Sequence, residues 1–366
     1  MHKKFFKDIS LSRLGMGVMR MPMADAEHID YPKAHEILDK AYAGGINYYD
    51  TAYVYQGGDS ERCLGAWMQK YPRDSFYVAS KFNVNANPDY EAVFAEQLER
   101  LQTDHIDFYL LHCLMDNNVD KYIDSGAIAY FAEQKRLGKI RYLGFSSHAS
   151  VETLARFADH HDWDFAQIQM NYYDWQNGTT AKEYEVLNSR NIPIMVMEPV
   201  RGGRLATLTD EVEGMLKAVE PDWSMASWAL RFVKSYDGVQ VVLSGMSTLE
   251  QTEDNIHTFA EAEGLDEQHM VALLEAGKVF RKQIQVPCTE CRYCVPECPM
   301  GINIPEFLKF YNAYKLSGKW GLNGIDKVES EGKISDCVGC GACAARCPQN
   351  IDIPAIMAEL KEALEK

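Results

Sequence analysis

The sequence predicts an α/β protein in which a closed (β/α)8 barrel precedes a smaller, mainly α-helical domain at the C-terminus. Short β-rich runs alternate with longer amphipathic runs over the first 265 residues, and eight of the ten cysteines fall between Cys288 and Cys347. A chain of 366 residues is long enough for one large domain and one modest one. We expect a barrel over 1–265, a connecting helix over 266–285 and a cysteine-rich domain over 286–366.

Eight β-rich runs are the candidate strands, and they are Leu14–Met19, Ile46–Asp50, Phe76–Lys81, Ile106–His112, Tyr142–Ser146, Ala166–Met170, Ile194–Glu198 and Val239–Ser244. Eight strands that alternate with helices suit a closed barrel of the TIM type. A doubly wound sheet is the alternative, but it normally carries a glycine-rich dinucleotide turn after its first strand. Gly15-x-Gly17 lacks the third glycine of that turn, which favours the barrel.

Helix-start signals mark several of the amphipathic runs. Asn87-Pro88 offers a capping residue followed by proline, so we expect a helix from there whose buried face carries Val93, Phe94, Leu98 and Leu101. The run from Thr248 to Gln251 has the form of a capping box and predicts a second helix start.

The composition excludes several classes of protein. The formal net charge is −16, and so acidic a chain repels phosphate backbones, which argues against a nucleic-acid partner. No run of about 18 apolar residues occurs, so no ordinary transmembrane helix is expected. The first eight residues include lysines, but no apolar stretch follows them as in a signal peptide. We therefore expect a soluble cytoplasmic protein with no membrane partner.

The eight clustered cysteines form two copies of one pattern, Cys288-x2-Cys291-x2-Cys294-x3-Cys298-Pro299 and Cys337-x2-Cys340-x2-Cys343-x3-Cys347-Pro348. Disulfides are typical of secreted chains, and nothing here indicates secretion. Zinc is the stronger alternative, because two-residue gaps also suit tetrahedral thiolate sites, although zinc ribbons usually separate two ligand pairs by a long gap. Three cysteines at two-residue gaps, with a fourth followed by proline, are typical of [4Fe–4S] sites in bacterial ferredoxins.

In that ferredoxin pattern the fourth cysteine of each run normally ligates the other cluster. We therefore expect one [4Fe–4S] cluster on Cys288, Cys291, Cys294 and Cys347, and a second on Cys337, Cys340, Cys343 and Cys298. Residues 304–314 and 353–364 carry apolar side chains at helical spacing, so this part of the chain resembles the α-helical two-cluster ferredoxin modules.

Polar side chains follow neighbouring strands of the predicted barrel, where the active sites of such barrels lie. Asp50 and Tyr55 come at or after the second strand, Lys81 ends the third and His112 ends the fourth. Each residue alone could be structural or solvated. Together they supply a carboxylate, a phenol, an ammonium and an imidazole from adjacent strands, which indicates a site that donates a proton to a carbonyl group.

These residues also resemble the aldo-keto reductases over essentially all of residues 8–262. The resemblance rests on residues 47–55 (NYYDTAYVY), Ser80-Lys81, residues 110–112 (LLH), residues 144–147 (GFSS), residues 167–169 (QIQ) and Asn255. It implies a carbonyl reductase that uses NAD(P)H.

The resemblance also implies a role for each polar residue. Tyr55 would be the general acid, Lys81 would lower the pKa of its phenol, Asp50 would hold Lys81 as an ion pair, and His112 would orient the substrate carbonyl. Ser146 and Gln169 would bind the carboxamide of the nicotinamide.

Some nucleotide-binding positions depart from the family pattern. Met197 stands where many members stack an aromatic ring on the nicotinamide. Gly245 and Gln251 replace the Lys and Arg that usually clamp the 2′-phosphate of NADP, and Glu250, Glu253 and Asp254 lie nearby in the sequence, which mildly favours NAD. Asn255 is retained near the last barrel helix. Arg20 could reach the pyrophosphate or could be a surface arginine.

The remaining candidates have ordinary structural interpretations. Cys63 and Cys113 suit small apolar positions in the core, and Trp175 and Tyr53 could line the substrate entrance or only pack loops. We hypothesise an enzyme that reduces an aldehyde or a ketone, or oxidises the matching alcohol, with clusters for electron transfer, redox sensing or structure. The alternative is an electron-transfer protein whose barrel docks a nicotinamide or a partner. A flavoprotein or a ferredoxin is a candidate redox partner.

Overall fold

The computed structural model describes residues 1–25 and 27–365. The chain divides into two compact units, each of which is discontinuous in sequence. The first, which we call the barrel unit, comprises Met1–Val200 and Leu216–Leu274. The second, the cysteine unit, comprises Arg201–Met215 and Glu275–Lys366.

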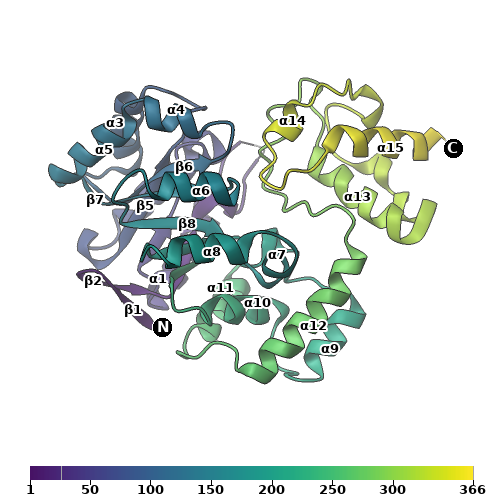
Figure 1. Cartoon of the computed structure of the whole chain (residues 1–366), viewed down its shortest axis with the longest axis horizontal. Helices are drawn as coiled ribbons and strands as arrows, with labels where there is room; N and C mark the ends of the chain where they lie inside the picture. Colours follow the sequence, from purple (N-terminus) through teal and green to yellow (C-terminus); the bar gives the residue numbers. More distant parts are fainter. Residues whose placement is uncertain (26, 366) are drawn as a thin grey trace. The chain divides into compact units, whose positions relative to one another are not determined.

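Eight parallel strands close a barrel in the first unit (Figure 1), which confirms the predicted fold. Around the barrel they are β3 (Leu14–Gly17), β4 (Tyr48–Asp50), β5 (Tyr77–Phe82), β6 (Ile106–Leu114), β7 (Ile140–Ser147), β8 (Phe165–Gln169), β9 (Ile194–Met197) and β10 (Val239–Ser244). Pairing of β10 with β3, for example Val242 opposite Leu14, closes the sheet and excludes the doubly wound alternative.

An antiparallel hairpin of β1 (Lys3–Phe6) and β2 (Ile9–Ser12) precedes the barrel, and the sequence analysis missed it. Phe6 packs edge-on against Tyr142 at 4.9 Å and lies 5.4 Å from Phe108 and 6.5 Å from Phe165, ring centre to ring centre. Those partners stand near the first residues of β6, β7 and β8. The hairpin therefore fills the amino-terminal end of the barrel, and the opposite end carries the polar side chains.

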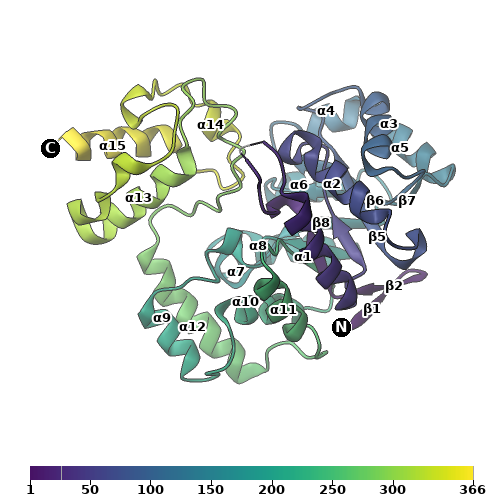
Figure 2. The same cartoon turned by 180° about the vertical axis from the view of Figure 1, so that it is seen from behind.

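Helices surround the strands (Figures 1 and 2). They are α1 (Tyr31–Ala43), α2 (Asp59–Met68), α3 (Tyr90–Leu101), α4 (Val119–Asp124), α5 (Ala127–Arg136), α6 (Val151–Ala158), α7 (Tyr172–Asn177), α8 (Thr180–Asn188), α10 (Met225–Lys234) and α11 (Leu249–Thr258). Thr248 caps α11 as predicted. The predicted start at Asn87-Pro88 was wrong, because Asp89 caps α3 by accepting from the Ala92 amide.

The cysteine unit is mainly helical, as predicted. Its helices include α13 (Ile304–Ser317), α14 (Ala342–Ala345) and α15 (Ile353–Glu365). The chain passes between the two units within α9 (Asp210–Lys217) and within α12 (Glu267–Gln283). Apolar side chains of α13 and α15, among them Leu308 and Leu360, form a core that also contains the thiols of Cys288, Cys294, Cys343 and Cys347.

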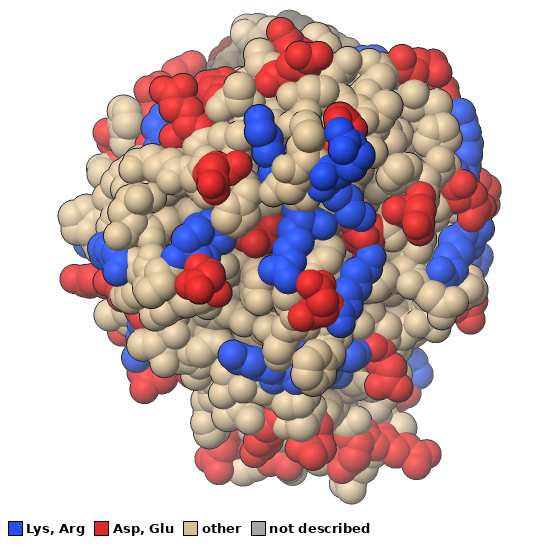
Figure 3. Space-filling view, turned by 90° about the vertical axis from the view of Figure 1, so that its left-hand side faces the viewer, with Lys and Arg blue, Asp and Glu red and all other residues tan. Residues whose placement is uncertain are grey.

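Charged side chains are mixed on the face of the molecule shown in Figure 3, where Lys and Arg alternate with Asp and Glu. Within the described residues, no helix combines the length and the apolar character needed to cross a membrane.

Candidate functional site

The four predicted proton-transfer residues meet at the carboxyl end of the barrel. Asp50 is the last residue of β4, Tyr55 begins the short 3-10 segment after it, and Lys81 and His112 lie near the ends of β5 and β6. The Lys81 ammonium is 1% exposed and forms an ion pair with Asp50. It also donates to the Thr51 carbonyl at 2.7 Å and to the Tyr55 hydroxyl at 3.5 Å. The fold thus places a cation beside the phenol.

The surroundings of Lys81 keep it charged. Burial lowers the pKa of this amine, but the Asp50 carboxylate and the Tyr55 phenol more than offset that effect, so its pKa is raised overall. The carboxylate is itself fixed, because the Gln167 side-chain amide donates to its other oxygen at 3.2 Å. With Asp50 and Thr51 bound on its other sides, the Lys81 ammonium interacts with the phenol oxygen of Tyr55.

Tyr55 lies between Lys81 and His112. The Lys81 nitrogen is 5.0 Å from the centre of the Tyr55 ring, and the His112 ring meets that ring edge-on at 5.7 Å. The Tyr122 hydroxyl donates to the His112 carbonyl and so fixes the backbone of this strand end. Tyr55 is half-buried whereas Lys81 and His112 are buried, so the phenol is the most accessible acid of the three.

Three residues predicted to contact the nicotinamide stand at the ends of consecutive strands. Ser146 is next to last in β7, and its buried hydroxyl accepts from the Cys113 amide at 2.8 Å, which leaves the hydroxyl proton for donation. Gln169 ends β8, and its amide donates to Asp174 at 2.7 Å. Met197 ends β9 directly beside it in register. The hydrogen-bonding side chains of Ser146 and Gln169 suit a carboxamide, and Met197 suits a flat apolar ring beside it.

The other predicted nucleotide residues lie around the loop after β10. Arg20 follows β3, and a Cβ at Gly245 would lie 3.4 Å from the Arg20 side chain, so the arginine stem rests against this loop. The Arg20 guanidinium is 3.6 Å from Glu198. Gln251 accepts from the Ser247 amide at 2.8 Å, and the buried Asn255 amide donates to the Ser244 hydroxyl at 2.9 Å. Arg20 therefore belongs to this end of the barrel.

The sequence analysis missed several polar residues behind the site. Asp174 binds the amides of both Gln169 and Asn171 at 2.7 Å. The sequence did contain a signal for Asp174, because Asn171 caps α7 and Asp174 is the third residue after this cap. Glu61 and Arg100 form a buried pair at 3.0 Å near Lys81. These two residues lie on different helices, so no local pattern connected them.

The eight clustered cysteines gather around two hollows in the cysteine unit. The first, of about 300 Å³, is lined by Cys288, Cys291, Cys294 and Cys347. The second, of about 360 Å³, is lined by Cys298, Cys337, Cys340 and Cys343. In each hollow three cysteines come from one run and the fourth from the other. This is the crossed grouping that the two runs predict.

The two hollows differ in their surroundings. Thr289, Arg292 and Gln349 line the first, and Arg204 donates to the Cys288 carbonyl at 3.0 Å while Arg201 donates to Gln349 at 3.2 Å. Apart from its cysteines, the second is lined by glycine, proline and apolar side chains, among them Met300, Ile302, Val338 and Met357. Cys340, by contrast, is exposed. Among the residues that the structure describes, polar and cationic side chains therefore line the first hollow but not the second.

The remaining candidates are structural. Cys63 is fully buried, and burial raises the pKa of its thiol to about 12, so it is inert at neutral pH. Trp175 packs against Tyr236 at 4.5 Å. The Tyr53 ring lies under the Arg100 guanidinium at 4.4 Å and its hydroxyl donates to Glu96, so this side chain packs against α3.

Comparison with protein families gives two matches. The model described as "Aldo/keto reductase family" matches residues 13–276, and the model described as "4Fe-4S dicluster domain" matches residues 287–352. The second match begins one residue before Cys288, where the cysteine pattern begins.

Individual relatives extend over most of the barrel. The uncharacterized oxidoreductase YqkF of Bacillus subtilis is 27% identical over 300 residues, which cover 73% of this chain and 92% of that protein. The NADH-specific methylglyoxal reductase of Escherichia coli is 24% identical over 302 residues, which cover 68% and 90% of the two chains. A solved aldo-keto reductase from Klebsiella pneumoniae in complex with NADPH has a TM-score of 0.62 at 20% identity, with 76% and 96% covered.

Proposed function

The chain belongs to the aldo/keto reductase family, and from this premise we propose that it reduces an aldehyde or a ketone with NADH or NADPH, with Tyr55 as the general acid. One observation carries the proposal: the buried Lys81 ammonium lies between the Asp50 carboxylate and the Tyr55 phenol. An unperturbed phenol holds its proton until about pH 10, and an ammonium in hydrogen-bond contact favours the phenolate that remains after proton donation.

The residues divide the work of carbonyl reduction. When bound, the nicotinamide supplies a hydride to the carbonyl carbon. Tyr55 gives its phenol proton to the carbonyl oxygen, which completes the alcohol. Lys81 stabilises the phenolate left behind, and Asp50 keeps Lys81 charged and in place. His112, whose ring stands edge-on to Tyr55, orients the carbonyl oxygen toward the phenol. Reprotonation of Tyr55 from water restores the acid.

The strand ends fit a nicotinamide. Ser146 and Gln169 bring hydrogen-bonding side chains to neighbouring strand ends, as a carboxamide needs, and Met197 offers the apolar contact beside them. Arg20 rests against the loop at Gly245, where it could contact a phosphate of the nucleotide. Lys40 pairs with Glu253 and Ser224 binds Asp254, so two of the three carboxylates near Gln251 have partners within the protein.

The cysteine unit fits two [4Fe–4S] clusters. Each hollow is lined by four cysteines in the crossed grouping, and the family model that matches this segment describes a dicluster domain. When bound, the clusters supply one-electron redox chemistry.

Hydride transfer and cluster redox chemistry differ in the number of electrons that move in one step. A nicotinamide moves two electrons as a hydride, whereas each cluster moves one, and a flavin normally bridges such centres. The sequence contains no flavin signature. We therefore assign carbonyl reduction to the barrel unit, and redox sensing, structure or exchange with an external one-electron partner to the clusters.

A second function has an observation of its own in its favour. Cys340 is exposed beside the second hollow, and Val338 and Met300 next to it are 66% and 38% exposed. Such a surface would bring a cluster within reach of a redox protein. In this alternative the chain is an electron-transfer protein and its barrel docks a nicotinamide or a partner.

A substrate screen tests the proposed function. Protein purified without oxygen is mixed with NADH or NADPH and a panel of aldehydes and ketones, and both nicotinamide oxidation and alcohol formation are measured. The proposal expects equal amounts of alcohol and oxidised nicotinamide, with at least one small carbonyl turned over. Nicotinamide oxidation that requires a one-electron acceptor and yields no alcohol would favour the electron-transfer alternative instead.

A further inference from the structure

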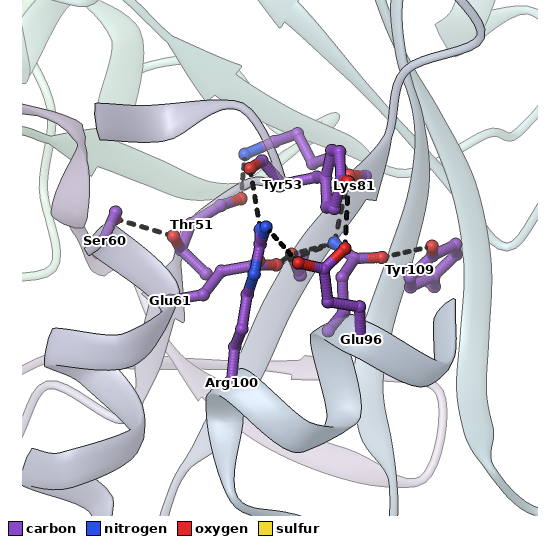
Figure 4. Close-up of polar contacts among 10 residues, drawn as sticks. Thr51, Tyr53, Ser60, Glu61, Lys81, Glu96, Arg100 and Tyr109 are labelled. Carbon is purple, nitrogen blue, oxygen red and sulfur yellow. Dashed lines mark hydrogen bonds and ion pairs between the residues drawn. The ribbon is translucent and has the colours of Figure 1, made fainter. Parts of the chain in front are cut away.

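A buried polar network lies behind Lys81 and the loop that carries Tyr55 (Figure 4). Its centre is Glu61, in the first turn of α2, whose side chain is fully buried. One Glu61 oxygen accepts from Ser80 at 2.5 Å and from Gln97 at 2.7 Å, and the other accepts from Arg100 at 3.0 Å. We call Glu61, Ser80, Gln97 and Arg100 the Glu61 network.

One side of the Glu61 network holds the strand end that carries Lys81. Ser80 is the residue before Lys81 in β5, and its hydroxyl is bound to Glu61. The Gln97 amide donates to the Lys81 carbonyl at 3.2 Å as well as to Ser80 at 2.8 Å. Tyr109 on the next strand donates to the Gln97 oxygen at 2.5 Å, so the orientation of that amide is fixed.

The other side of the network holds the loop that carries Tyr55. Arg100 donates to the Tyr53 carbonyl at 3.1 Å, and its guanidinium covers the Tyr53 ring. Gly58, at the end of the loop, packs so closely that a Cβ there would lie 2.4 Å from the same guanidinium. Arg100 therefore touches the loop on both sides of Tyr55.

The loop itself needs external support. Gln56, Gly57 and Gly58 all have positive φ, of 45°, 58° and 90°, and such a conformation is unfavourable for the glutamine. Thr51 and Ser60 join the two ends of the loop through a hydroxyl contact of 2.7 Å. A loop with this backbone keeps its shape only where its surroundings specify it.

A gain in folding stability does not by itself explain why the Glu61 network is present. Burial raises the pKa of Glu61, and the hydrogen bonds from Ser80, Gln97 and Arg100 offset that cost only in part. Buried ion pairs are often no more stabilising than apolar side chains of the same volume. The contacts instead connect Lys81 and Tyr55, the two residues whose separation matters for proton donation.

We propose that Glu61, Gln97 and Arg100 are positioning residues that hold the Tyr55 loop against the Lys81 strand end and so set the distance between the ammonium and the phenol. The inference rests on the proposed function, because it concerns the same acid. If the network is weakened, Lys81 stabilises the phenolate less. Reduction then slows, and the decline in rate at high pH, where the phenol loses its proton, moves to higher pH.

The test uses the full chain with its clusters and compares Arg100→Lys with wild type. The lysine keeps a cation beside Glu61 but cannot also bond the Tyr53 carbonyl and cover Gly58. We expect kcat for carbonyl reduction to fall about 10- to 100-fold, as misplacement of a catalytic group by about 1 Å can do. We also expect the high-pH limb to move up by about one unit and the nucleotide Kd to stay within about twofold.

Arg231→Lys is the matched control, because the Arg231 side chain is 5% exposed and that of Arg100 is 10% exposed. Arg231 lies on another barrel helix, α10, covers the Trp223 ring at 4.1 Å and pairs with Glu261 at 3.1 Å. This control should leave the pH profile unchanged. If Arg100→Lys does not fold, Ser80→Ala, which deletes one hydroxyl, must move the same limb by a smaller amount.

The possible outcomes separate the two proposals. A wild-type protein that reduces no carbonyl overturns the proposed function, and this inference with it. A wild-type protein that reduces carbonyls while Arg100→Lys, or Ser80→Ala in its place, keeps kcat and the pH limb unchanged overturns the inference and leaves the proposed function standing. An equal shift in Arg231→Lys would also overturn it, because the effect would then be a general consequence of losing a buried arginine.

Discussion

The barrel unit and the cysteine unit hold their functional side chains by different means. In the barrel, Lys81 binds Asp50, Thr51 and Tyr55. Gln167 binds the other oxygen of Asp50, so contacts within the protein hold these side chains in place. In the cysteine unit, by contrast, the thiols line two hollows and four of them belong to the hydrophobic core.

The two units therefore fix the geometry of their functional side chains by different interactions. The barrel site is preorganised, because hydrogen bonds and burial fix its groups before any cofactor binds. Burial raises the pKa of the thiols of Cys288, Cys294 and Cys347. If the proposed clusters bind there, their binding contributes directly to the folding free energy of the cysteine unit.

The largest expected effect comes from removing the acid of the preorganised site. Tyr55→Phe keeps the ring but loses the proton, so carbonyl reduction should fall about 10²- to 10⁴-fold, while NADH binding survives. Tyr71→Phe is the control, because its hydroxyl binds Asp39 at 3.0 Å on the outer surface. Steady-state kinetics and nucleotide titration check the prediction. A Tyr55→Phe protein with near-normal turnover would place the acid elsewhere.

Iron removal should affect the two units unequally. After chelation, we expect hydrogen exchange of α13 and α15 to lose most of its protection, because their core contains four of the proposed cluster ligands. The barrel strands, whose core has no cysteine cluster, should keep theirs. Anaerobic protein should first contain about eight iron atoms per chain. Loss of protection in both units at the same chelator concentration would contradict the comparison.

Paired cysteine substitutions sharpen the account of the two hollows. Cys291→Ser with Cys347→Ser removes two ligands from the first hollow, so about four iron atoms should remain. Cys291→Ser with Cys298→Ser removes one ligand from each hollow, so both clusters should be lost or strongly weakened. Iron assay and electron paramagnetic resonance measure both. The reverse pattern would show that each run of cysteines holds its own cluster.

The smallest expected effect concerns the choice of nucleotide. We expect NADH to bind at least as well as NADPH, because Gly245 and Gln251 offer no cation to a 2′-phosphate and Glu250 lies beside them. Like charge at this partly screened distance costs about 1 kcal/mol, which is several-fold in affinity. Titration of both nucleotides at low salt measures the ratio. NADPH binding tenfold tighter would show that Arg20 or another cation meets the phosphate.

The sequence could predict the barrel because eight β-rich runs alternate with amphipathic ones, and it could predict the cysteine hollows because three of the four cysteines of each hollow lie in one short run. It could not predict what depends on contacts between distant elements. The hairpin that begins at Lys3 looked like a basic terminus, although Phe6 fills the end of the barrel. Gln97 is fully buried on α3, whereas the expected Leu98 is only half-buried.

Charged residues were the hardest to place. A glutamate and an arginine on two helices suggest solvent-exposed positions, because burial of a charge is costly unless it is paired. Glu61 and Arg100 are 39 residues apart, and their pairing exists only because α2 and α3 pack side by side. The proton-transfer residues were recognisable from their strand ends, whereas the residues proposed to position them were not.

The central claim is that the barrel transfers a hydride to a carbonyl without passing electrons through the clusters. Rapid mixing of anaerobic, cluster-loaded protein with NADH and a carbonyl substrate, with nicotinamide and cluster absorbance followed together, tests it most directly. The account predicts that nicotinamide absorbance falls in step with alcohol formation, that cluster absorbance stays constant, and that Tyr55→Phe abolishes the fast phase. Bleaching of the clusters by NADH alone, with Tyr55→Phe as fast as wild type, would contradict it.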